Sequence, residues 1–170
     1  TRNRNIKLDN ESNIWTGTWR DEHFGFNYEG GPFPENNISG QMYMGDVWRS
    51  DPLHIPFNFK KHRFWRYINN IEKLKKNEKF IIKKPIIGHE FDMDIDNGYR
   101  PIGLQYLSQT IIDNCQYLQD WGITYDTGTG IHRLTLYRDQ LTGAWVFAAG
   151  SIMFSWALDS YHDSATGIPP

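Results

Sequence analysis

The 170-residue sequence has little cysteine, little excess charge and no long hydrophobic run. Its single cysteine, Cys115, cannot form an intrachain disulfide, and a thiolate zinc site needs several ligands at short spacing, so both features are excluded. Lys and Arg total 18 against 20 Asp and Glu, so the basic footprint of a nucleic-acid-binding protein is missing. With no apolar run of about 18 residues, the sequence predicts no membrane-spanning segment.

Aromatic residues, in contrast, are abundant. The 7 Trp, 9 Tyr and 10 Phe exclude a disordered chain, which could not bury so much apolar surface. The length is that of one domain. However, the sequence begins at Thr1 without a methionine and stops at Pro170 in an irregular stretch. We therefore expect residues 1–170 to form part of one domain that is truncated at both ends.

The clearest local pattern is a β-hairpin. Residues 132–138 alternate with period two, a loop ending at Gly143 follows, and residues 144–149 form the returning strand. Gly150 and Ser151 then lead into a predicted helix over 152–158, which is the kind of strand-to-helix joint where ligand sites lie.

Elsewhere the pattern is weaker. Residues 64–68 are predicted as a strand, with a continuous helix over 63–75 as the alternative. The other expectations are a helical turn at 34–38, a strand broken by Pro56 at 53–59, a helical turn at 71–74, strands at 80–82 and 102–107, and a loop at 122–130.

The densest chemistry is an acidic segment. On a strand, period two would place its four carboxylates on one face; they belong to Glu90, Asp92, Asp94 and Asp96. An EF-hand starting at Asp92 is excluded, because Asn97 stands where glycine is required and Gly103 where the final acid is required. A looser oxygen-ligand site for a hard cation and a plain acidic turn at 96–98 both stay open.

The histidines are a second source of chemistry. His132 lies in the hairpin, and His162 lies between Asp159 and Asp163, whose carboxylates would fix its tautomer and raise its basicity. Neither an H-x-H nor an H-E-x-x-H metal motif is present.

Several short motifs, in this order and spacing, resemble the C-terminal domain of the large (beta) subunit of N,N-dimethylformamidase and its bacterial relatives. The resemblance extends from about Trp19 to the end of the chain. The motifs are residues 88–92 (GHEFD), 96–101 (DNGYRP), 132–138 (HRLTLYR), 147–151 (FAAGS), 156–159 (WALD) and 162–163 (HD).

The resemblance implies a fold. The full domain of this family is similar to class I glutamine amidotransferases, with a flavodoxin-like α/β core and added β-hairpins. The chain would be the second half of that domain and would itself have an α+β content.

The resemblance also implies a reaction, the hydrolysis of small amides with a mononuclear iron held by two tyrosines and one glutamate. The glutamate aligns with Glu90, whereas the tyrosines belong to upstream motifs that are not found between Thr1 and Pro170. A ferric ion suits carboxylate and phenolate oxygens. We therefore expect these 170 residues alone to bind iron poorly and to be inactive.

The motif positions make His132, Asp159 and His162 candidates for proton transfer. The implied partners are a small amide substrate, the rest of the domain, and a small subunit or a second copy of the chain. The alternative function is a non-catalytic binding module in a larger, secreted, multidomain protein, in which the aromatic residues serve a carbohydrate or partner surface. The sequence does not indicate the compartment.

Overall fold

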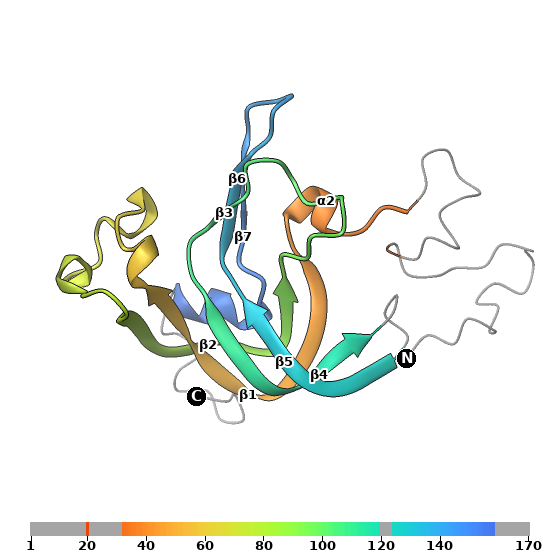
Figure 1. The fold of residues 1–170 in the computed structure, drawn as a ribbon, viewed down its shortest axis with the longest axis horizontal. Coiled ribbons are helices and arrows are strands. Elements are labelled where there is room, and N and C mark those ends of the chain that lie inside the picture. The colour runs from red at the N-terminus through yellow and green to blue at the C-terminus, as the bar shows by residue number, and fades with distance from the viewer. Residues whose placement is uncertain (1–19, 21–31, 120–123, 159–170) are drawn as a thin grey trace, which may run out of the picture.

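The computed structural model describes residue 20 and residues 32–119 and 124–158 (Figure 1). This part of the chain is mixed α+β, with mostly antiparallel strands and few helices. The α+β content expected from the sequence is therefore confirmed. One sheet has the order β2-β1-β4-β5 and the other β3-β6-β7. The strands are β1 (Met42–Pro56), β2 (Lys79–Met93), β3 (Gln105–Tyr106), β4 (Thr110–Gln119), β5 (Thr124–His132), β6 (Thr135–Arg138) and β7 (Trp145–Ala148).

The helices are short. They are α2 (Asn36–Ser39) and the 3-10 turns η1 (Phe57–Phe59), η2 (Arg63–Trp65), η3 (Ile71–Lys73) and η4 (Ile152–Ala157). No helix in the described ranges is long and apolar enough to cross a membrane.

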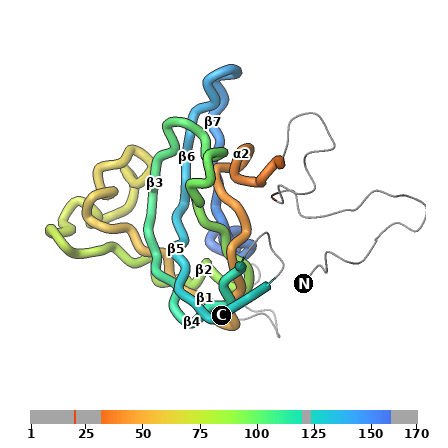
Figure 2. Tube along the Cα trace, turned by 45° about the vertical axis from the view of Figure 1, so that its right-hand side comes forward, coloured from red at the N-terminus to blue at the C-terminus, as the bar shows by residue number. Residues whose placement is uncertain are grey.

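Strands β1 and β2 form a long antiparallel ribbon that bends strongly along its length (Figures 1 and 2). Its pairing runs from Met42 opposite Met93 to Pro56 opposite Lys79, with several register shifts between. One shift lies where Pro52 faces Pro85. Because proline has no N–H for the ladder, regular pairing cannot continue there. Such irregularities increase the local twist and bend of a strand.

The curved sheet closes around Phe91, which is fully buried. A Cβ at Gly45 of β1 would lie 3.0 Å from the Phe91 ring, and one at Gly130 of β5 would lie 2.5 Å from it. The two glycines therefore let β1 and β5 approach the ring closely, and β5 contacts β2 although the two strands stand at opposite ends of the strand order. Around Phe91 the core contains Leu53, Ile55, Ile86, Ile87, Leu107, Ile112 and Leu134.

The predicted hairpin is confirmed as β6 and β7, which pair from Thr135 opposite Ala148 to Arg138 opposite Trp145. Beyond β7, Gly150 has a left-handed φ of 64° and its carbonyl accepts a hydrogen bond of 2.8 Å from the Asp92 N–H. Next to it, Ser151 forms a bridge with Phe91. The chain after the hairpin is thus attached directly to β2.

Several local predictions are confirmed. The helical turn at 34–38 appears as α2, which ends at Gly40 with a φ of 81°. The turn at 71–74 appears as η3, and Pro56 is the last residue of β1.

Other local predictions are wrong. Residues 122–130 were expected to form a loop, but Thr124–His132 is strand β5, where the glycines serve close packing rather than a turn. Residues 63–75 form neither a strand nor a continuous helix; the 3-10 turns η2 and η3 occur there, because Trp65 turns inward and its indole N–H donates to the Leu107 carbonyl at 2.8 Å. Of 102–107, only Gln105–Tyr106 is strand.

The helix predicted over 152–158 appears as the short 3-10 helix η4, Ile152–Ala157.

We expect Gly130→Ala to lower the free energy of unfolding by about 1–3 kcal/mol, because the new methyl would overlap the Phe91 ring. Denaturant unfolding measures the loss. In the double variant with Phe91→Leu, the smaller side chain leaves room for the methyl, so the combined loss should be less than the sum of the single losses. Strictly additive losses would contradict the close contact.

Candidate functional site

The acidic segment divides at the end of β2. Strand β2 ends at Met93, so only Glu90 and Asp92 of the four acids belong to it. Asp94 turns inward, and its carboxylate accepts a bond of 2.7 Å from Nη1 of Arg133. Asp96 stays exposed and pairs with Arg100 at 2.8 Å. The expectation of four carboxylates on one strand face was therefore wrong, because the strand ends and arginine draws Asp94 inward.

Near Glu90, the register of β1 and β2 sets residues with oxygen-bearing side chains opposite one another. In the register of β1 and β2, Asp46 stands opposite Glu90, and Tyr43 stands opposite Asp92. The hydroxyl of Tyr43 lies 3.2 Å from that of Tyr125 on β5. We call these five residues the oxygen cluster.

Asp92, which is half-buried, has an unusual protonation equilibrium for a carboxylate. Burial raises its pKa to about 6, with the negative charge of Glu35 as the next cause; Arg20 opposes the shift and Glu90 adds to it. Arg20 is engaged elsewhere, because its guanidinium binds the Glu35 carboxylate at 2.7 and 3.2 Å. Asp92 is thus partly protonated near pH 6, which reduces repulsion within the oxygen cluster.

Tyr43 is held as a neutral phenol in this arrangement. Burial raises its pKa, and the hydrogen bonds with Tyr125 and Asp46 raise it further. Its deprotonation would require a nearby positive charge, since cations favour the charged form of a phenol.

The carboxylate and phenol oxygens of the oxygen cluster are of the kind that binds a hard cation. They do not form a complete metal site. Glu90 is exposed, and no described residue forms a hydrogen bond or an ion pair with its side chain, so its carboxylate is free to bind a ligand. Carboxylate and phenol oxygens are the donors that a ferric ion prefers. Among residues 20, 32–119 and 124–158, however, no group of three or more His, Cys, Asp or Glu side chains is placed to hold a metal. Glu90 is a single candidate ligand.

His132, a predicted proton-transfer residue, is completely buried at the end of β5. Its Nε2 lies 2.8 Å from the Ala149 carbonyl, which can only accept, so Nε2 carries the proton. Its Nδ1 has no partner among the described residues. Burial lowers the pKa to about 4, opposed by the bond to Ala149 and by the charge of Asp94. At neutral pH the ring is therefore uncharged, with one free lone pair.

Tight packing surrounds this histidine. A Cβ at Gly150 would lie 2.5 Å from Oε1 of Gln41 and 3.0 Å from Nε2 of His132, so only glycine fits there. Oε1 of Gln41 and Oγ1 of Thr135 are also buried without a partner in the described part of the chain. The other two predicted proton-transfer residues, Asp159 and His162, lie outside the described residues.

Asp94 is the centre of a charge network between the two sheets. Its side chain is 2% exposed and contacts Arg133 at 2.7 Å and Arg100 at 3.6 Å. The Arg133 guanidinium stacks 4.5 Å above the Tyr106 ring and donates to Gln109 at 3.3 Å. The network connects the end of β2 to β3 and to the chain between β5 and β6.

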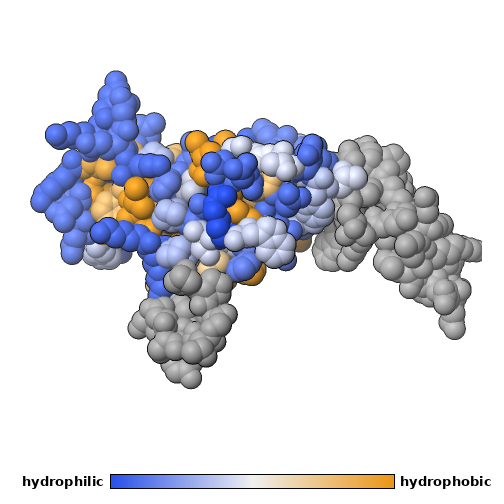
Figure 3. Space-filling model, turned by 90° about the horizontal axis from the view of Figure 1, so that it is seen from below, coloured by the Kyte–Doolittle hydropathy of each residue, from blue (hydrophilic) through white to orange (hydrophobic). Residues whose placement is uncertain are grey.

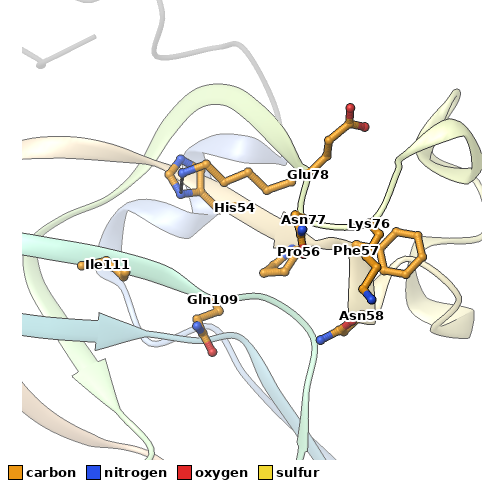
Figure 4. A pocket seen from close by; sticks show the side chains of 10 residues that line it. His54, Pro56, Phe57, Asn58, Lys76, Asn77, Glu78, Gln109 and Ile111 are labelled. Carbon is orange, nitrogen blue, oxygen red and sulfur yellow. Dashed lines mark hydrogen bonds between the residues drawn. The ribbon is translucent and has the colours of Figure 1, made fainter.

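A separate cavity of about 470 Å³ opens where β1 and β2 diverge from β4, between His54, Phe57, Lys79 and Ile111 (Figure 4). Nζ of Lys79 lies 3.1 Å from Nδ1 of His54. Burial lowers the His54 pKa, the charge of Lys79 lowers it further, and Asp51 opposes both. Figure 4 shows the Glu78 carboxylate pointing away from the other labelled side chains. The lining includes neither Glu90 nor His132.

Sequence reasoning missed three members of the oxygen cluster, namely Tyr43, Asp46 and Tyr125. Tyr125 was placed in a loop because glycines follow it, and the strand containing Tyr43 has no clear alternation. Only the pairing of β1 with β2 places Asp46 opposite Glu90, and only the approach of β5 places Tyr125 beside Tyr43. Such long-range pairing has no local signal in the sequence.

Comparison with known proteins gives one match. The model of a family described as "N,N-dimethylformamidase beta subunit-like, C-terminal" matches residues 1–166. No curated protein matches the chain, and no solved structure matches it.

The charge network predicts that substituting two neighbouring acids lowers the free energy of unfolding by different amounts. Asp94→Asn should lower the free energy of unfolding by about 2–3 kcal/mol, because it removes the charge of a buried carboxylate that pairs with the partly buried Arg133. Asp96→Asn is the matched control: this exposed partner of Arg100 should cost less than about 1 kcal/mol. Thermal and denaturant unfolding of both variants measure the difference. Equal losses in the free energy of unfolding would contradict a structural role for the network.

The buried His132 predicts a loss of stability in acid. The unfolded chain binds a proton near pH 6.5 and the folded chain only near pH 4, so stability falls as the pH drops between these values, by about 3 kcal/mol in total. His132→Gln should remove this part of the slope, whereas His62→Gln, a change in a surface turn, should leave it unchanged. Unfolding free energies from pH 7 to pH 4 give the comparison; identical slopes for wild type and His132→Gln would contradict it.

Proposed function

Since the chain belongs to the family of N,N-dimethylformamidase beta subunit-like C-terminal domains, we propose that it is part of a domain that hydrolyses small amides with a mononuclear iron. The observation that carries the proposal is Glu90. By the resemblance of residues 88–92 to the family motif, Glu90 aligns with the glutamate ligand, and its carboxylate is exposed and has no hydrogen-bond or ion-pair partner among the described residues. Two tyrosines from upstream motifs would complete the ligand set.

We assign residues 1–170 to the second half of this domain. The antiparallel sheets are consistent with the β-hairpins that the family adds to its core. The glutamine amidotransferase-like, flavodoxin-like core would then come from the rest of the domain. A small subunit or a second copy of the chain is the proposed partner.

The iron, when bound, would supply Lewis acidity for polarising an amide carbonyl or activating water. Glu90 contributes one anionic oxygen ligand. In the hydrolysis, a water oxygen attacks the carbonyl carbon, the C–N bond breaks, and the amine leaves with a proton, giving a carboxylic acid and an amine. We assign the proton transfers to His132 or to the pair Asp159 and His162. The His132 ring is neutral at pH 7 and its Nδ1 lone pair is unpartnered among the described residues, although its complete burial and lowered pKa make it a weak base.

A second candidate function is a non-catalytic binding module of the same family. The observation that favours it is an exposed group of aromatic side chains beside a groove, where Tyr67 is 82% exposed and Trp145 62% exposed. Aromatic side chains in such positions are typical of binding surfaces.

Iron analysis of the full-length protein tests the proposed ligand. We expect about one iron per chain in the wild type and a loss of most of it in Glu90→Ala, because removing a first ligand weakens metal binding strongly. Hydrolysis of N,N-dimethylformamide, followed by release of dimethylamine, should fall in parallel. Glu78→Ala removes an exposed carboxylate elsewhere on the chain and should change neither quantity.

Two outcomes would contradict the proposal. Unchanged iron content in Glu90→Ala would show that Glu90 is not a ligand. Absence of both iron and hydrolysis in the wild-type protein would leave the binding module as the function.

A further inference from the structure

A second pocket lies between the turn segment after β1 and the smaller sheet. Its volume is about 550 Å³. The walls are formed by side chains of residues 62–67 on one side, and by Gln105 of β3, Leu136 of β6 and Trp145 of β7 on the other. It shares no residue with the oxygen cluster or with the surroundings of His132.

The polar wall of this pocket presents hydrogen-bond donors. Nδ1 of His62 accepts from the Phe64 N–H at 3.1 Å, so in the neutral ring Nε2 carries the proton and donates to Oε1 of Gln105 at 3.0 Å. With its oxygen engaged, Gln105 has its NH₂ group left to donate. The indole N–H of Trp145 can only donate. These groups favour a ligand with hydrogen-bond acceptors.

The charge of the lining is entirely positive. Arg63 and Arg66 contribute two guanidiniums, and no Asp or Glu lines the pocket. Neither arginine has a carboxylate partner within the described residues. The Arg66 guanidinium lies 4.6 Å from the centroid of the Tyr67 ring. A guanidinium binds a carboxylate through two parallel hydrogen bonds, so this positively charged lining favours a carboxylate ligand.

The apolar part of the pocket consists of aromatic planes. Tyr67, Trp145 and Phe64 are 82%, 62% and 43% exposed. Phe64 is held in place, because it stacks on Phe147 with ring centroids 5.4 Å apart and packs edge-on against the buried Trp65 at 4.7 Å. An exposed aromatic plane such as that of Trp145 is suited to the flat face of a ring. In Figure 3, the end of the molecule that carries residues 57–78 mixes hydrophobic and strongly hydrophilic surface.

We propose that this pocket binds a carboxylate carried on a ring, with the carboxylate on Arg63 and Arg66 and the ring against Trp145. The ring can be that of an acidic sugar or of an aromatic acid, since both offer a flat apolar face and a carboxylate. The proposal does not depend on amide hydrolysis, because its residues are distinct from Glu90 and the proton-transfer candidates.

Calorimetric titration of the full chain tests the proposal with two probes and their neutral counterparts. The probes are trigalacturonate and benzoate, and the neutral counterparts are galactotriose and benzamide. We expect at least one carboxylate probe to bind ten-fold or more tightly than its neutral counterpart, with an affinity that falls as salt rises. Arg63→Gln, Arg66→Gln and Trp145→Ala should each weaken that binding ten-fold or more.

Lys61→Gln is the matched control, because it removes a positive charge from the same turn segment without touching the pocket lining. It should leave the affinity unchanged. Binding of trigalacturonate alone would identify a sugar acid, and binding of benzoate alone an aromatic acid. Lack of binding by both probes, equal binding of the neutral compounds, or an equal loss in Lys61→Gln would overturn the proposal. None of these results depends on iron content, so the two proposals fail separately.

Discussion

The packing of Phe91 against two glycines is the constraint on which the rest of the structure depends. The ring fills the space where β1 and β5 approach, and any side chain larger than hydrogen at Gly45 or Gly130 would occupy the same volume. Interiors of proteins are packed so densely that this contact fixes the distance between the strands. Because β5 is held there, Tyr125 reaches Tyr43 and the curved sheet closes.

The same contact determines which residues of β2 face the core and which face outward. Phe91 points inward, so its neighbours Glu90 and Asp92 point outward in the alternation of a strand. The inward residue supplies stability, and the outward residues supply oxygen donors. Within residues 88–92, the inward position thus packs in the core, and the positions on either side of it carry the carboxylates.

The sequence predicted features that depend on neighbouring residues. The hairpin of β6 and β7 has a clear period and a glycine-ended loop, and α2 has a proline near its start and Gly40 at its end. Family membership also followed from short motifs in a fixed order.

Features that depend on distant contacts could not be predicted in this way. Residues 122–130 resemble a loop because of their glycines, yet those glycines are required by Phe91 and by Tyr117 across the sheet. The acids after Met93 leave the strand because Arg133, far along the chain, offers Asp94 a buried partner. Likewise, the pocket beside Trp145 exists only because the segment after β1 folds onto the smaller sheet. Local propensity is overruled in each case by a contact made elsewhere.

The attachment of Gly150 and Ser151 to β2 has a consequence for the order of events during synthesis. The Asp92 N–H and the Phe91 bridge are completed only by residues near the end of the described chain. Until these residues leave the ribosome, the edge of β2 beside Glu90 keeps unpaired backbone groups and Phe91 lacks part of its cover. Long-range strand pairing of this kind delays folding. Until it forms, the unpaired strand edge can pair with other chains and aggregate. The nascent chain therefore presents an unpaired stretch of β2 until residues 150 and 151 have been synthesised.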